Sequence, residues 1–81
     1  MSDQMLDRIV IDPRIMLGKP IVEGTRITVE AILDRMAAGA EVAAVLEDYP
    51  ELTREDVLAA LAYARGVVGT DEILPRFVNV G

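Results

Sequence analysis

The sequence predicts a mainly α-helical fold, a tri-helical helix-turn-helix-like bundle that follows a small amino-terminal β-element. Short β-prone segments separated by turn residues occupy residues 8–28, and three stretches of helical apolar periodicity follow between residues 29 and 69. Gly39 and Pro50 separate these three stretches. We therefore expect a single domain over 1–69, divided into the β-element (8–28) and the three-helix unit (29–69), and a carboxyl-terminal tail over 70–81.

The β-element is predicted from paired β-branched residues and the turns between them. Residues 8–11 form a first candidate strand, which Asp12 and Pro13 end. Residues 20–22 form a second, and residues 27–29 are a candidate third. Pro20 belongs at a strand start or edge, and Gly24 suits a tight reversal that needs a positive φ. Residues 1–7 are polar, and we expect them to fray.

The first predicted helix covers residues 29–38. Thr28 is a good N-cap, and Gly39 stands where a left-handed residue ends a helix. The second helix is expected over 41–48, with a poor cap in Ala40 and a stop at Pro50. The apolar stripe of the first helix has full amphipathic spacing and comprises Val29, Ile32, Leu33, Met36 and Ala37.

The third predicted helix begins after the N-cap Thr53 and ends near Gly66 and Gly69. Its apolar positions form two adjacent stripes, one of which runs through Val57, Ala60, Leu61, Ala64 and Val68. Such a face is wider than one core needs. It is typical of a helix that is buried between its own domain and a partner.

The composition favours a homodimer. The chain has 81 residues, of which 52% are hydrophobic, and its mean hydropathy is +0.32. A domain of this size buries only about 60% of its unfolded surface, so a monomer would be marginally stable. A second copy that covers apolar surface explains this composition, and the alternative is a well-packed, alanine-rich monomer.

Catalysis is poorly supported by the residue types present. The sequence contains no cysteine and no histidine, which excludes disulfides, thiolate metal sites and the commonest general base. Gly18-Lys19 is followed by proline rather than by the Ser/Thr and helix of a phosphate-binding loop. We therefore expect no enzyme, cofactor or metal. No signal peptide or membrane-length apolar run is evident, so a cytoplasmic protein without membrane contact is expected.

Charge is distributed unevenly, which bears on DNA binding. Residues 1–27 carry four basic and four acidic side chains, whereas residues 28–81 carry four basic and ten acidic ones. The helical part therefore repels polyanions. Because nucleic-acid binders gain affinity by neutralising phosphates, this charge is an argument against strong DNA binding by the helices. In a helix-turn-helix reading, the third helix would be the recognition helix, with Arg54 as the one side chain near its start that suits DNA. The amino-terminal candidates for DNA contact are Arg8, Arg14, Lys19 and Arg26, and the alternative is that these are surface residues or local ion-pair partners.

Several short motifs resemble a widespread prokaryotic family of small proteins that was long catalogued only as a domain of unknown function. The resemblance covers residues 8–65, most of the chain, and its most specific part is the glycine-rich block. The matching residues are Ile11-Asp12-Pro13, Gly18-Lys19-Pro20, Gly24-Thr25-Arg26-Ile27, Tyr49-Pro50, Leu52-Thr53 and Glu55-Asp56-Val57.

The resemblance implies a helix-turn-helix-like fold and an antitoxin that is paired with a PIN-like ribonuclease toxin. Such antitoxins wrap the toxin with an apolar tail, and an arginine inserted among the carboxylates of the toxin site could replace the charge of the metal. The tail residues that match this role are Ile73, Leu74, Arg76, Phe77 and Val78. The alternative is that the tail packs on the dimer as a terminal strand.

Three hypotheses of function follow from these observations. The first is an antitoxin-like homodimer that neutralises a PIN-like toxin and represses its own operon through operator DNA. The second is a DNA-binding regulator without a toxin. The third is a structural dimerisation module.

Overall fold

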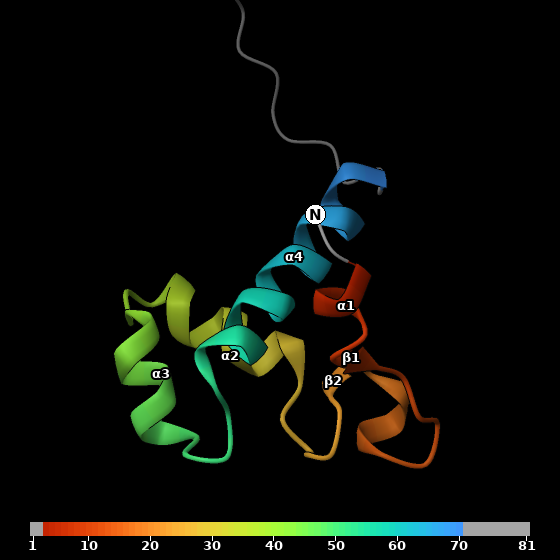
Figure 1. The fold of residues 1–81 in the computed structure, drawn as a ribbon, viewed down its shortest axis with the longest axis horizontal. Helices are drawn as coiled ribbons and strands as arrows, with labels where there is room; N and C mark the ends of the chain where they lie inside the picture. The colour runs from red at the N-terminus through yellow and green to blue at the C-terminus, as the bar shows by residue number, and fades with distance from the viewer. Residues whose placement is uncertain (1–2, 71–81) are drawn as a thin grey trace, which may run out of the picture.

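A computed structural model describes residues 3–70 of the chain and confirms the predicted fold class. A small β-element lies at one end of the molecule and α3 at the other, with α4 rising between them (Figure 1). The elements in chain order are α1 (Asp3–Leu6), β1 (Ile9–Val10), the 3-10 turn η1 (Met16–Gly18), β2 (Ile21–Val22), α2 (Val29–Ala37), α3 (Val42–Asp48) and α4 (Arg54–Thr70).

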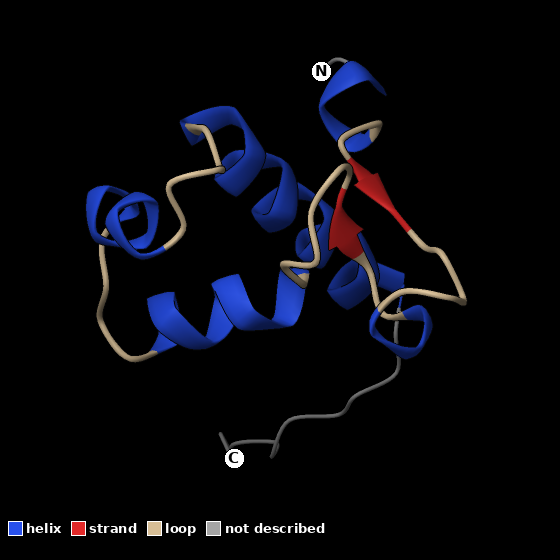
Figure 2. Ribbon diagram, turned by 90° about the horizontal axis from the view of Figure 1, so that it is seen from below, coloured by secondary structure: helices blue, strands red, loops and turns tan. Residues whose placement is uncertain are grey.

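The β-element forms where the sequence predicts it. β1 and β2 pair antiparallel, with Ile9 opposite Val22 and Val10 opposite Ile21 (Figure 2). The reversal after β2 places Gly24 at φ +82°, and the Val22 N–H donates to the Ile27 carbonyl at 3.0 Å. The candidate third strand is reduced to one bridge, between Ile21 and Thr28.

The helices α2 and α3 begin and end close to the predicted residues. The Thr28 hydroxyl accepts from the Ala31 N–H at 2.9 Å, which confirms this N-cap, and Gly39 follows the helix at φ +105°. The start of α3 is less well capped, because Glu41 occupies the N-cap position and makes no side-chain hydrogen bond there. The capping chemistry of the sequence is therefore a reliable guide to these helix ends.

Two predictions at the ends of the domain are wrong. Residues 3–6 form α1, where fraying was expected, because this short helix packs on α4. Gly66 and Gly69 do not end α4, which continues through both to Thr70. Glycine lowers helix propensity by only about 1 kcal/mol, and the packing against α1 outweighs that preference.

The core lies between the β-element and the three longer helices. Ile32 of α2, Val45 of α3 and Val57 of α4 are fully buried and meet at its centre. Val22 and Ile27 close it on the side of the hairpin. The first part of α4 is thus committed to the core, whereas its last turns extend past it.

Candidate functional site: the carboxyl-terminal half of α4 and its surroundings

The turn between α3 and α4 is fixed by a capping box. The Thr53 hydroxyl accepts from the Asp56 N–H at 3.2 Å, and the Asp56 carboxylate accepts from the Thr53 N–H at 2.9 Å. The second carboxylate oxygen of Asp56 accepts from the Arg8 guanidinium at 3.0 Å. The start of α4 is therefore tied to the residue that precedes β1, and Asp56 turns inward.

Three of the five predicted DNA contacts are engaged in ion pairs. Arg8 pairs with Asp56, as described above. Arg14 pairs with Asp12 at 2.9 Å, and Lys19 pairs with Glu30 at 2.8 Å. These side chains match the alternative stated from the sequence, that of local ion-pair partners.

The two exposed pairs also shift the pKa of each partner. The hydrogen bond from Arg14 lowers the pKa of Asp12, and that from Lys19 lowers the pKa of Glu30. The same bonds raise the pKa of Arg14 and of Lys19. These directions are those expected when each partner stabilises the charged form of the other.

Arg54 and Arg26 differ from the other three basic candidates. Both are exposed, and among residues 3–70 neither forms an ion pair or a side-chain hydrogen bond. The turn that contains Arg26 is held instead by Thr25, whose hydroxyl donates to the Val22 carbonyl and accepts from the Ile27 N–H. The structure leaves these two arginines available, but it does not gather all five basic side chains into one cluster of unpaired charge.

Sequence reasoning missed one further ion pair, on the far side of the domain. The Arg35 guanidinium contacts the Asp48 carboxylate and lies 5.7 Å from the centre of the Tyr49 ring. It links the end of α2 to the end of α3. The only available sequence signal was the opposite charge of the two side chains. They lie thirteen residues apart across a glycine turn, so no helical or strand periodicity identifies them as partners.

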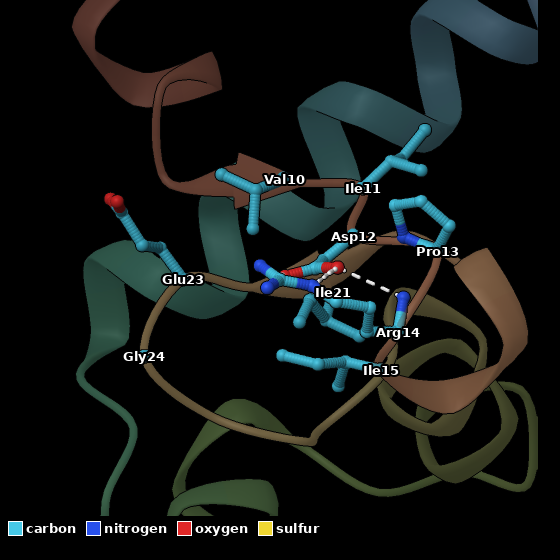
Figure 3. A pocket seen from close by; sticks show the side chains of 9 residues that line it. All are labelled: Val10, Ile11, Asp12, Pro13, Arg14, Ile15, Ile21, Glu23 and Gly24. Atoms are coloured by element: carbon cyan, nitrogen blue, oxygen red, sulfur yellow. Dashed lines mark hydrogen bonds and ion pairs between the residues drawn. The ribbon is translucent and has the colours of Figure 1, made fainter.

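An open hollow of about 520 Å³ lies beside the β-element (Figure 3). Asp12 and Arg14 bond to one another across its wall, through three hydrogen bonds of 2.9–3.0 Å. Apolar side chains form most of the remaining lining, namely Val10, Ile11, Pro13, Ile15 and Ile21. Asp12 and Arg14 satisfy one another, and Glu23, an exposed residue, is the remaining charged member of the lining.

The loop that follows this hollow exposes a large apolar side chain. Met16 and Leu17 adopt left-handed backbone angles, with φ of 51° and 60°, before Gly18 at 79°. Leu17 is 94% exposed. Two successive non-glycine residues in this region are unusual, since each costs of order 1 kcal/mol or more. No pattern in the sequence predicts this feature.

An exposed apolar surface lies around the last turns of α4. A groove of about 250 Å³ separates α4 from the start of α2, and its lining is apolar apart from Glu30. A second groove, of about 220 Å³, lies on the α1 side of the same helix. Tyr63 and Val67 line both grooves. They form a ridge between two apolar hollows, beside Val68, which is 72% exposed.

This surface is the continuation of the broad apolar face predicted for the third helix. Val57 and Ala60 lie in the core, whereas Ala64 and Val68, further along the same stripe, line the open groove. The helix therefore has more apolar face than its own domain covers within residues 3–70. The predicted partner-binding residues Ile73, Leu74, Arg76, Phe77 and Val78 lie outside the described residues.

Neither a metal centre nor a membrane helix is found in the described part of the chain. Residues 3–70 contain no group of three or more carboxylate, histidine or cysteine side chains that could hold a metal ion. No helix there is both long and apolar enough to cross a bilayer.

Two solved structures resemble this fold. One is the crystal structure of a DUF433 member protein from Anabaena variabilis, with 34% identity and a TM-score of 0.73 over 82% of this chain and 66% of that one. The other is the X-ray crystal structure of Rv2018 from Mycobacterium tuberculosis, with 35% identity and a TM-score of 0.62. That match covers 73% of this chain and 28% of Rv2018, so the chain spans little more than a quarter of the length of Rv2018.

Sequence comparison leads to the same family. An uncharacterized protein from Archaeoglobus fulgidus is 50% identical over 26 residues, which are 32% of this chain and 72% of that protein. The family model described as a protein of unknown function, DUF433, matches residues 9–64, which include the β-element, α2, α3 and most of α4. The chain therefore belongs to the DUF433 family.

Proposed function

We propose that this protein is an antitoxin-like binding protein that acts as a homodimer, neutralises a PIN-like ribonuclease toxin and represses its own operon. The observation that carries the proposal is the apolar surface around the last turns of α4. It lies directly before residues 71–81, which contain the five predicted partner-binding residues. The toxin class comes from the family resemblance described in the sequence analysis.

The chemistry of this surface supports a protein partner. Contiguous exposed apolar surface on a small domain is typical of an interface. Val68, Val67 and Leu6 are among the large apolar side chains that the domain leaves exposed, and all three lie on or beside the two grooves. Tyr63 adds an aromatic ring with a polar tip, a side chain that is common at interface hot spots.

The acidic side chains that could suggest a carboxylate active site have structural partners. Asp48 pairs with Arg35, and Asp56 completes the capping box and pairs with Arg8. Their neighbours Glu47 and Glu55 are exposed on the helix surface. This arrangement favours binding over catalysis as the function.

Inhibition of ribonuclease activity tests the proposal. The full chain is co-expressed with a PIN-like ribonuclease encoded beside its gene, and the complex is purified and assayed for RNA cleavage. We expect a stable complex with suppressed cleavage, and loss of both on Arg76→Ala combined with Phe77→Ala. Val68→Asp should weaken the complex, whereas Leu17→Asp, at an equally exposed apolar residue away from α4, should not. A complex unaffected by the combined Arg76→Ala and Phe77→Ala changes and by Val68→Asp, or no complex at all, contradicts the proposal.

DNA binding without a toxin is the second candidate, and one observation favours it. Arg54 is the first residue of α4, which would be the recognition helix, and it forms no ion pair with another residue of the described range 3–70. The exposed Glu55 beside it opposes a close approach of phosphates. Arg54→Glu should abolish a salt-dependent mobility shift of the protein's own promoter, whereas Arg65→Glu, at the other end of α4, should leave it intact. Equal behaviour of the two variants rules out α4 as the reading helix.

A further inference from the structure

We infer that the chain's own residues 73–78 occupy the groove between α2 and α4 when no partner is bound. This inference concerns the free protein and does not rest on the proposed toxin. The groove is lined from one side by Pro20, Val29 and Leu33 and from the other by α4. It is open along its length in the described structure.

The end of the described chain lies beside this groove. Thr70 closes α4, and the groove residues Val68 and Tyr63 precede it by two and seven positions. At a rise of about 1.5 Å per residue, they lie about 3 and 10 Å back along the helix axis. An extended residue spans about 3.3–3.6 Å, so a chain that reverses after Thr70 passes the whole groove within a few residues. The eleven residues from 71 to 81 are long enough for this path.

The composition of this segment fits the groove. Pro75 opposes a continuation of α4, since it lacks an N–H and excludes the preceding residue from helical angles. Ile73 and Leu74 come first after the two acidic residues that follow Thr70, and so reach the end of the groove at Val68. On this path Phe77 comes next, further along the groove toward Tyr63. An apolar groove and an apolar segment therefore occur at matched positions.

The charge at the rim of the groove also favours binding of this segment. Glu30 lines the groove, and Asp34 lies one turn further along the same exposed face of α2. Lys19 pairs with Glu30 and also interacts electrostatically with Asp34, which leaves this rim with one excess negative charge. Arg76 lies between Leu74 and Phe77 in the sequence, so it arrives beside this rim when its neighbours enter the groove.

Tryptophan fluorescence tests the inference, because the natural chain contains no tryptophan. In the full chain with Phe77→Trp, we expect emission at a shorter wavelength than that of tryptophan in water. Adding Val68→Asp should shift the emission to the red, whereas adding Leu17→Asp should leave it unchanged. Circular dichroism establishes that each variant is folded, and Val68→Asp is suited to this purpose because its side chain is largely exposed.

A dilution series separates the possible occupants. Emission that stays constant on dilution through the monomer range supports docking within one chain. A red shift on dilution assigns the groove to the tail of a second copy and overturns the inference, as does water-like emission in the undiluted protein. Loss of ribonuclease inhibition in the preceding experiment does not affect these outcomes, so the two ideas fail separately.

Discussion

The Arg8–Asp56 pair provides a quantitative test of the role assigned to Arg8. If Arg8 is a structural residue that ties the amino-terminal segment to the start of α4, its removal destabilises the fold in a way that depends on Asp56. The two atoms are 3.0 Å apart, and the Arg8 side chain is 44% exposed against 12% for Asp56. A double-mutant cycle measures their coupling directly.

The expected magnitudes follow from this geometry. A hydrogen bond to a charged group contributes about 1.5–3 kcal/mol, but the exposure of Arg8 reduces this value toward the range of surface ion pairs. We expect about 1 kcal/mol for the pair, and about 1 kcal/mol more for the capping role of Asp56. Asp56→Ala should therefore lower the free energy of unfolding by about 2 kcal/mol and Arg8→Ala by about 1 kcal/mol, with little further loss in the double variant.

Urea denaturation followed by far-ultraviolet circular dichroism at pH 7 measures these free energies. The Asp12–Arg14 pair serves as the control, and we expect weaker coupling there because the Arg14 side chain is 87% exposed. Strictly additive losses at Arg8 and Asp56 would refute the structural role of the pair. Arg8 would then return to the set of candidate DNA contacts.

Four further predictions concern stability and the pKa of Glu30. Ile32→Ala should lower the unfolding free energy by about 2–5 kcal/mol in urea denaturation, because the side chain is fully buried. Gly24→Ala should lower it by about 1–2 kcal/mol, since its φ of +82° is unfavourable for a residue with a Cβ. Gly66→Ala should raise the midpoint of thermal unfolding by stabilising α4 by roughly 0.5–1 kcal/mol, because alanine has the higher helix propensity and, among residues 3–70, an added Cβ meets no atom within 4 Å. Lys19→Gln should return the lowered pKa of Glu30 toward its ordinary value in an NMR titration.

The Lys19 prediction also fixes the direction of a pH dependence. Because the pKa of Glu30 is lowered in the folded chain, its contribution to stability is present above the unfolded pKa and is lost as the pH falls through the folded pKa. The natural chain should lose more stability than Lys19→Gln between neutral and acidic pH. Parallel curves for the two proteins would contradict this linkage.

The prediction for Gly66→Ala has its own contradicting outcome. A lower midpoint of thermal unfolding would show that α4 is constrained at Gly66 by contacts other than those that an added Cβ meets.

Local chemistry made much of the fold predictable. The N-cap at Thr28, the reversal at Gly24 and the stop at Pro50 each depend on a few adjacent residues, and the structure has a helix or strand end at each. The missed elements depend on distant contacts. Nothing local to residues 3–6 indicates α1, which exists through packing on α4, and the same contact carries α4 past Gly66.

The candidate site was predictable in part. The excess apolar face of α4 follows from spacing alone, so a partner surface could be expected there. The two grooves could not be predicted, because they depend on how α1 and α2 pack against α4. Arg8, Arg14 and Lys19 were proposed from charge balance. Their acidic partners lie 48, 2 and 11 positions away, and a periodic pattern does not encode the longest of these separations.

The position of α4 at the end of the described chain has a consequence for biosynthesis. The hairpin, α1, α2 and α3 all contact this helix or the core that it completes, yet the ribosome makes it after all of them. Chains grow at about 5–20 residues per second, so the earlier two thirds wait for seconds with their apolar faces exposed. A nascent chain that is released before Arg54 lacks α4, so its other elements have no helix to pack against. Such a chain is a substrate for chaperones and proteases. Cellular abundance of this protein should therefore respond sharply to translational stalling within its last third.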